Sequence, residues 1–385
     1  MAAGKHRVLL LMAATCWLLG SSPATAAGAS APRARPNDPL FKYQWHLPAI
    51  QIPEAWRVSR GRGAVVAVLD TGVAFESRGA YRRAPDLAGT RFVPGWDFVD
   101  GDSHPNDEPP SDRQSHGTHI AGIIAQTTGN RIGGAGIAPE ASIMPIRVLK
   151  RDVTGSARAV ARGLRFAADH GADIANLSIA GASDVKVVRE AVAYAESRGV
   201  TVIASAGNGG RAPVSFPAAY PSVIAVGAVR RDRARAYYSG YGKALDLVAP
   251  AGERQVDSEG GESGDGVLQQ TLKGGASAFC YCLMASTSAA SAQVSGAAAL
   301  LVASGRATRP AAIRAALTSG ARDLGRPGRD AEYGSGLLQA AAALQAASHE
   351  EEGSASPVSP RLAWVLVGAL AAAAGAAVLT RRRRR

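Results

Sequence analysis

AVVAVLDTGV, residues 64–73, is the stretch that decides the fold class of this 385-residue chain. Its first six residues, 64–69, are all apolar and rich in valine, and Asp70-Thr71-Gly72 follows them directly. An unbroken apolar run of this length is typical of a strand buried on both faces, and Asp-Thr-Gly is typical of a turn. The stretch therefore predicts an inner strand of a parallel sheet with a carboxylate at its carboxyl end.

Similar apolar runs recur along the chain, with helical patterns between them. The apolar runs occupy residues 142–148, 173–179, 200–204 and 223–226, and amphipathic patterns occupy residues 157–169 and 184–197. Alternation of this kind predicts an α/β domain with a central, mostly parallel sheet and helices on both faces. Active sites of such sheets form beyond the carboxyl ends of the strands, so the residues after each run are candidates for function.

Four polar side chains lie at strand ends or helix starts. They are Asp70 after the first run, His116 at the start of a small-residue helix, Asn208 after the run at 200–204, and Ser288 before a helical stretch at 289–302. Each alone has a structural explanation, such as a turn, a structural histidine or a helix N-cap. An aspartic protease would need a second Asp-Thr/Ser-Gly, and a lipase would need a G-x-S-x-G elbow; the chain has neither.

The chain resembles the subtilisin-like serine proteases, the subtilases, in four segments. They carry the Asp, His, Asn and Ser motifs in order: AVVAVLDTGV (64–73), SHGTHIAGIIA (115–125), ASAGNGG (204–210) and STSAASAQVSGAAALL (286–301). The likeness covers roughly residues 38–347 and implies a subtilisin-like fold and a serine endopeptidase. It implies that Ser288 attacks the peptide carbonyl, His116 carries the proton and Asp70 orients the imidazole. Asn208 and the backbone N–H of the serine would stabilise the oxyanion.

The resemblance also implies how a polypeptide substrate is held. One segment is similar to the strand that pairs with an extended substrate, and a second to a wall of the main specificity pocket: Ser178, Ile179 and Ala180, and Ser205, Ala206 and Gly207. Main-chain pairing does not read side chains, so we expect broad specificity with an apolar bias.

Two positions near Ser288 depart from the family pattern. Ser286 stands where the family usually has Gly, which would tighten the approach to the nucleophile. Ala292 stands where the family usually has Pro, a residue that shapes the helix start. These departures keep a second hypothesis open, a catalytically degenerate subtilase that acts as a peptide-binding surface protein.

Three segments are similar to the strong calcium site of the family: Asn37-Asp38-Pro39, Pro85-Asp86-Leu87 and residues 129–136. Carboxylate, amide and carbonyl oxygens are the ligands that Ca²⁺ prefers. The resemblance implies a structural Ca²⁺, and its ligands would be the side chains of Asp38, Asp86 and Asn130 with backbone oxygens of Ile132 and Gly134. Ordinary surface turns are the alternative.

The two ends of the chain predict a secreted, membrane-anchored protein. Residues 1–27 have the basic start, apolar stretch and small-residue site of a signal peptide, and residues 28–347 form the expected catalytic domain. Residues 348–360 are an acidic Ser/Pro-rich linker, and residues 361–380 predict a single transmembrane helix. The arginines at 381–385 predict a cytoplasmic tail, which leaves the catalytic domain extracytoplasmic.

Two alternatives concern this topology. The C-terminal segment resembles a sorting signal that is clipped during surface attachment. The whole arrangement also resembles the mycosins of type VII secretion, although the N-terminal extension and core disulfides usual in that group are not expected here.

The charge distribution excludes a dedicated polyanion-binding protein. The formal net charge is +12, but eight of the 43 basic residues lie in the terminal segments, which leaves 35 basic against 31 acidic residues elsewhere. We therefore expect polypeptide substrates, a membrane contact through the C-terminal helix and no nucleic-acid partner. A monomer is expected.

Two cysteines, Cys280 and Cys282, remain after the signal peptide. A single intervening residue rarely accommodates a disulfide, and a metal site needs more soft ligands than this pair supplies. The pair is therefore predicted to be buried thiols.

Overall fold

The computed structural model describes residues 36–181, 183–253 and 265–354. The chain divides into two units, residues 1–34 and 35–385, and everything described lies in the second. The predicted signal peptide, transmembrane segment and basic tail therefore fall outside the described residues. Across the described ranges, no helix is long and apolar enough to cross a membrane.

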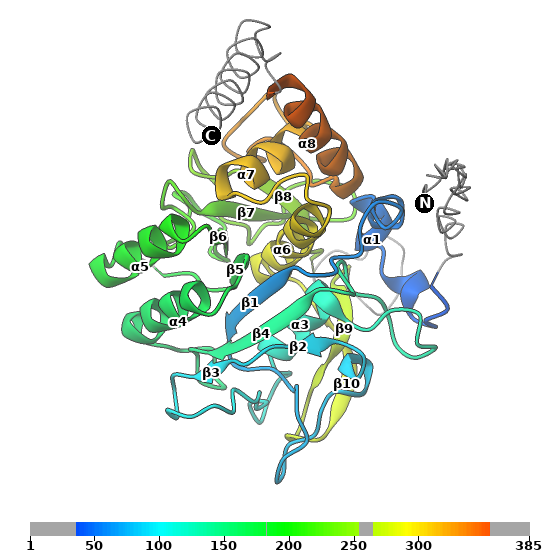
Figure 1. Cartoon of the computed structure of the whole chain (residues 1–385), viewed down its shortest axis with the longest axis vertical. Coiled ribbons are helices and arrows are strands. Elements are labelled where there is room, and N and C mark those ends of the chain that lie inside the picture. Colours follow the sequence, from blue (N-terminus) through cyan, green and yellow to red (C-terminus); the bar gives the residue numbers. More distant parts are fainter. Residues whose placement is uncertain (1–35, 182, 254–264, 355–385) are drawn as a thin grey trace, which may run out of the picture. The chain divides into compact units, whose positions relative to one another are not determined.

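An eight-stranded parallel sheet forms the centre of the second unit (Figure 1). The strand order is β2-β4-β1-β5-β6-β7-β8, and β3 also pairs with β4. The strands are β1 (Val65–Asp70), β2 (Arg91–Phe92), β3 (Trp96–Asp97), β4 (Ser142–Arg147), β5 (Ile174–Leu177), β6 (Thr201–Ser205), β7 (Ile224–Val229) and β8 (Leu247–Pro250). Every residue of β4 to β8 is buried, as expected for apolar runs covered on both faces. The predicted α/β class with a mostly parallel sheet is confirmed.

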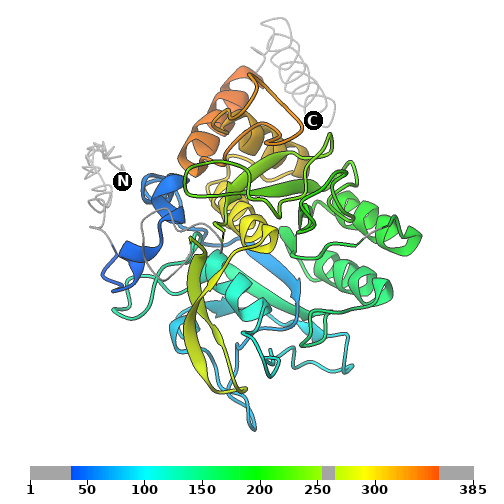
Figure 2. The same ribbon diagram turned by 180° about the vertical axis from the view of Figure 1, so that it is seen from behind.

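Helices cover both faces of this sheet (Figures 1 and 2). They are α1 (His46–Ala49), α2 (Ile52–Ala55), α3 (Gly117–Ala125), α4 (Ala157–Asp169), α5 (Lys186–Ser197), α6 (Thr287–Ala303), α7 (Pro310–Ser319) and α8 (Ala340–Ser354). The crossover from β1 through α3 to β4 runs along the sheet in the opposite direction from those through α4 and α5. Because such crossovers are right-handed, α3 lies on one face and α4 and α5 lie on the other.

This reversal of direction makes the carboxyl end of β1 a topological switch point. Strand β1 pairs with β4 on one side and with β5 on the other, so Val66 lies between Ile143 and Ile174. The chain leaves β1 toward the face that carries α3 and leaves the neighbouring β4 toward the opposite face, which carries α4, so a crevice opens beyond the strand ends. Asp70 is the last residue of β1 and therefore lies at this crevice.

Helix α6 packs against α3 on the same face and is buried along most of its length. It begins at Thr287, two residues before the stretch predicted from the sequence. The N-cap of α6 is Ser286, whose Oγ accepts a hydrogen bond from the backbone N–H of Ala289 at 3.4 Å. Ser288 therefore does not cap the helix, and its hydroxyl has no structural task there.

Strands β9 (Val267–Leu272) and β10 (Phe279–Met284) form a separate antiparallel pair. A disulfide within β10 joins Cys280 to Cys282, whose Cα atoms are 5.6 Å apart. The prediction of buried thiols is therefore wrong, and both cysteines are half-buried. Residues two apart on a strand point to the same side, and this Cα separation lies within the range that a disulfide spans.

Helix α8 passes the predicted end of the catalytic domain at residue 347 and continues to Ser354. It packs against α2, α6 and α7. The first residues of the predicted linker are thus helical.

Candidate active site

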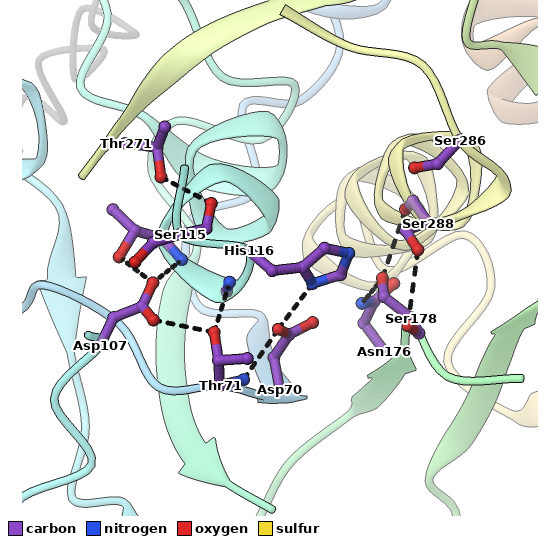
Figure 3. Close-up of polar contacts among 12 residues, drawn as sticks. Asp70, Thr71, Asp107, Ser115, His116, Asn176, Ser178, Thr271, Ser286 and Ser288 are labelled. Atoms are coloured by element: carbon purple, nitrogen blue, oxygen red, sulfur yellow. Dashed lines mark hydrogen bonds and ion pairs between the residues drawn. The ribbon is translucent and has the colours of Figure 1, made fainter. Parts of the chain in front are cut away.

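The carboxylate at the end of β1 and the imidazole at the start of α3 are in direct contact (Figure 3). His116 Nδ1 lies 2.7 Å from Asp70 Oδ1. Asp70 is fully buried, and the same oxygen accepts the backbone N–H of Thr71 at 2.8 Å. Burial lowers the pKa of His116, but the charge of Asp70 and its hydrogen bond outweigh burial, so the pKa is raised. The pair therefore makes the imidazole a stronger base.

The segment that precedes α3 is held from two sides. Thr271 Oγ1 in β9 donates to the carbonyl oxygen of Ser115 at 2.9 Å. On the other side, Thr71 Oγ1 accepts the backbone N–H of Gly117 at 2.9 Å. A Cβ added at Gly117 would lie 2.1 Å from the carbonyl oxygen of Gly72, so only glycine lets α3 approach the β1 turn this closely. These contacts fix the imidazole over the strand-end carboxylate.

Ser288 lies across the cleft from the imidazole, on the first turn of α6 (Figure 3). The edge of the His116 ring away from Asp70 faces this serine (Figure 3). The Ser288 hydroxyl donates to the carbonyl oxygen of Ser178 at 3.5 Å, which is a long contact. The contact to Ser178 holds the hydroxyl only weakly, so the hydroxyl can turn toward the imidazole when a substrate is bound.

Buried polar side chains hold the start of α6 against β5. Ser178 Oγ and Ser291 Oγ donate to the carbonyl oxygen of Ser288 at 3.3 and 2.9 Å. Asn176 Nδ2 donates to Ser178 Oγ at 3.0 Å, and Asn176 Oδ1 accepts from Ser295 Oγ at 2.9 Å. Sequence reasoning missed Asn176 and Ser295, because nothing in an apolar run or a small-residue helix distinguishes them.

Asn208 follows β6 and is exposed on the same cleft. Its Oδ1 accepts the backbone N–H of Thr287 at 2.9 Å and the Thr287 hydroxyl at 2.8 Å. Because Oδ1 is held by the residue before Ser288, the Nδ2 group is what the side chain can offer as a donor. An oriented amide donor beside a helix N-terminus suits developing negative charge.

One cleft of about 510 Å³ contains these groups. It is lined by Arg113, Gln114, His116, Leu149, Val153, Ser178, Ile179, Ala180, Ser205, Asn208, Met284, Ser286 and Ser288. Four of the six predicted substrate-binding residues are in that set, while Ala206 and Gly207 are buried directly after β6. Among these lining side chains, only Arg113 and His116 are ionisable.

The side chains predicted as calcium ligands also lie together, away from this cleft. Asn130 Nδ2 donates to Asp86 Oδ1 at 2.6 Å, and the Asn130 backbone N–H donates to Asp38 Oδ1 at 3.0 Å. Both carboxylates are buried, and neither forms an ion pair with a basic side chain in the described ranges. Burial, with the nearby charge of Asp38, raises the pKa of Asp86 to about 6. Two buried carboxylates and an amide without a balancing cation fit a divalent metal ion.

Ile132 and Gly134 lie on the loop that surrounds this pair. The Ile132 backbone N–H donates to Asn130 Oδ1 at 3.0 Å, and the Gly134 backbone N–H donates to Asp86 Oδ2 at 3.1 Å. The structure therefore brings all five predicted residues to one place, and the contacts of Ile132 and Gly134 there are made by their N–H groups, not by the carbonyl oxygens predicted as ligands.

A serine hydroxyl and an imidazole on one cleft, with a buried carboxylate behind the imidazole, are the components of a serine hydrolase site. The model of the subtilase family, Peptidase S8, matches residues 61–336, and the chain belongs to this family. Thermitase of Thermoactinomyces vulgaris is 42% identical over 216 residues, which are 56% of this chain and 73% of thermitase. Subtilisin BL of Lederbergia lenta is 37% identical over 306 residues, 78% of this chain and 98% of that protein.

A solved structure shows the same fold. It is a protease from Pseudoalteromonas arctica PAMC 21717, with a TM-score of 0.71 and 32% identity, and the match covers 82% of this chain and 100% of that one. Together with the family match, these relatives identify the chain as a serine endopeptidase.

Proposed function

We propose that the chain hydrolyses peptide bonds through Ser288, His116 and Asp70. The observation that carries this proposal is the 2.7 Å contact between buried Asp70 and His116, which lines one cleft together with Ser288. His116 accepts the proton of Ser288 as the hydroxyl attacks the carbonyl carbon, and Asp70 stabilises the imidazolium. The ring then returns the proton to the leaving amine, and a water molecule repeats the sequence to release the acyl group.

Two donors would stabilise the oxyanion of the tetrahedral intermediate. One is the backbone N–H of Ser288, which lies in the first turn of α6, where such groups have no acceptor within the helix. The other is Nδ2 of Asn208, whose orientation is set by Thr287. Both are in place before substrate arrives, so little reorganisation is needed at the moment of reaction.

The expected substrate is an extended polypeptide of broad sequence. Its backbone would pair with Ser178, Ile179 and Ala180 and would pass Ser205, Ala206 and Gly207. Apolar side chains on the cleft, those of Leu149, Val153, Ile179 and Met284, support a preference for apolar residues.

We further propose a structural Ca²⁺ held by Asp38, Asp86 and Asn130 with carbonyl oxygens of Ile132 and Gly134. Its positive charge would balance the two buried carboxylates and tie the segment at residue 38 to the loop at 129–136. The site is separate from the cleft, so the ion takes no part in peptide cleavage.

The proposed location is the cell membrane, with the catalytic domain outside and a single C-terminal anchor. This part of the proposal depends on the sequence of residues 1–27 and 361–385. Surface attachment after clipping of the C-terminus, and a mycosin-like assignment, are its variants.

A fluorophosphonate probe tests the catalytic proposal. The wild-type protein should be labelled in calcium buffer, and Ser288→Ala should abolish labelling. Ser286→Ala removes a hydroxyl from the same cleft and should leave labelling intact, which makes it the matched control. Absence of labelling in folded wild-type protein would instead support the peptide-binding, non-catalytic alternative.

A further inference from the structure

A second buried carboxylate, Asp107, lies beside the site, and the mechanism above gives it no role. Its exposed fraction is 0%, and it lies on the segment between β3 and α3. It forms no ion pair with a basic side chain anywhere in the described ranges. All of its hydrogen-bond partners belong to two threonines, Thr71 and Thr118.

The two threonines lie next to the proposed catalytic pair. Thr71 directly follows Asp70 at the end of β1, and Thr118 lies two residues after His116 in α3. Thr71 Oγ1 donates to Asp107 Oδ1 at 2.8 Å (Figure 3). The backbone N–H and the hydroxyl of Thr118 both donate to Asp107 Oδ2, at 2.8 and 2.6 Å. The carboxylate thus touches both segments that carry the pair.

Each threonine hydroxyl also accepts a backbone N–H from the opposite segment. Thr71 Oγ1 accepts from Gly117 of α3 at 2.9 Å, and Thr118 Oγ1 accepts from Ala74 of the β1 turn at 3.0 Å. Each hydroxyl can donate one hydrogen bond, and both threonines donate it to the carboxylate of Asp107. The carboxylate therefore orients both hydroxyls so that their lone pairs join the two segments.

We infer that Asp107 is a positioning residue that keeps Asp70 and His116 in contact by bracing the segments that carry them. The inference rests on the proposed catalysis by Asp70, His116 and Ser288. It adds a residue that touches neither substrate nor reacting atoms but controls how closely the base meets its orienting carboxylate.

The charge of Asp107 provides a readout that a merely structural residue lacks. Burial raises the pKa of Asp107, and the three hydrogen bonds donated by Thr71 and Thr118 oppose that effect and favour the ionised carboxylate. Burial lowers the pKa of His116, whereas the charges of Asp70 and Asp107 raise it and that of Arg113 lowers it. His119 is a further ionisable neighbour of His116. Removal of the Asp107 charge should therefore lower the pKa of the catalytic imidazole.

The test compares Asp107→Asn with a matched variant, Asp246→Asn. Asp246 is also buried and also accepts a backbone N–H, from Ala225 at 2.9 Å, but it lies at β8, outside the site. For Asp107→Asn we expect kcat to fall by about ten- to a hundredfold with KM nearly unchanged, because a slightly misplaced base affects the chemical step. The acidic limb of the kcat/KM profile should move to lower pH. Asp246→Asn should reduce the melting temperature and leave the profile in place.

Several outcomes would overturn the inference. Folded Asp107→Asn enzyme with wild-type kcat and an unchanged pH profile is one, and an equal shift of the profile in Asp246→Asn is another. If Asp107→Asn does not fold, the comparison of Thr71→Val with Thr71→Ser tests the inference, because only serine keeps the hydroxyl that bonds to Asp107. Equal kcat in these two variants would overturn the inference. An inactive wild-type enzyme would refute the proposed function instead. An NMR titration of the His116 ring in the wild-type protein and in Asp107→Asn would then still test the bracing, because the pKa of His116 should be lower in the variant.

Discussion

The burial of His46 in its neutral form leads us to predict that mild acid destabilises this fold. The side chain lies at the start of α1 with an exposed fraction of 0%, and neither ring nitrogen has a hydrogen-bond partner among the described residues. Burial, and to a smaller extent the nearby His119, lowers the pKa of His46 from 6.5 to about 3. Burial likewise lowers the pKa of His119 to about 4. Both rings are therefore held neutral in the folded state.

The sign and the size of the effect follow from proton linkage. The unfolded chain binds a proton at each ring below pH 6.5, whereas the folded chain resists protonation down to about pH 3 at His46. Stability is therefore complete above pH 6.5 and is lost as the pH falls toward 3. At pH 5, the depressed pKa of His46 costs about 2 kcal/mol, and His119 adds a similar amount. The two histidines together should remove roughly 4 kcal/mol between pH 7 and pH 5.

Urea unfolding at pH 7 and pH 5 measures this loss. The parent protein is Ser288→Ala, which prevents self-cleavage. It is compared with the same protein carrying His46→Leu, which removes the titrating group from an apolar site. The variant should lose about 2 kcal/mol less than the parent over this pH interval. His170→Leu, which removes an exposed histidine, is the matched control and should behave like the parent. Equal pH dependence in His46→Leu and the parent would refute the reasoning.

Two further predictions concern the oxyanion donor and the metal ion. Asn208→Ala should lower kcat by about 10²–10³-fold, the range found when subtilisin loses such a donor, with little change in KM; steady-state kinetics that show only a raised KM would contradict the assignment. EGTA should lower the melting temperature of the wild-type protein, because Ca²⁺ at about 100 times its Kd adds ~2.7 kcal/mol of stability. The melting temperature of Asp86→Asn should not respond to EGTA, whereas that of the control variant Asp112→Asn, which changes an exposed carboxylate, should respond as in the wild type. A response to EGTA in Asp86→Asn would show that Asp86 is not a ligand.

The parts of the site that sequence could predict lie where regular elements end. The apolar run at residues 64–69 predicts a strand buried on both faces with Asp70 at its carboxyl end, and Asp70 is the last residue of β1. The start of α3 at residue 117 likewise follows from the change of pattern around His116, and α6 begins at residue 287, two residues before the helical stretch predicted after Ser288. Parallel strands carry their ends to one edge of the sheet, so distant residues meet without any further information.

The parts that sequence could not predict depend on how irregular segments fold back on the sheet. Asp107 lies in a stretch rich in Pro and acidic residues, which reads as a solvated loop. Its burial comes from contacts of that stretch with the β1 turn, where the backbone N–H of Val73 donates to the carbonyl oxygen of Pro105 at 3.0 Å. The Cys280–Cys282 disulfide was missed because spacing along the sequence does not give the Cα separation of the two cysteines, which is 5.6 Å on β10.

The departure at Ser286 is compatible with catalysis, and the geometry explains why. Its φ of −168° is extended backbone that any residue adopts, so the absence of glycine introduces no strain here. The Ser286 hydroxyl caps α6 by accepting the backbone N–H of Ala289, so it has a structural task outside the chemistry. The Ser288 hydroxyl makes a single long contact to Ser178 and is available to the imidazole. A position that first suggested a degenerate site therefore supports an active one.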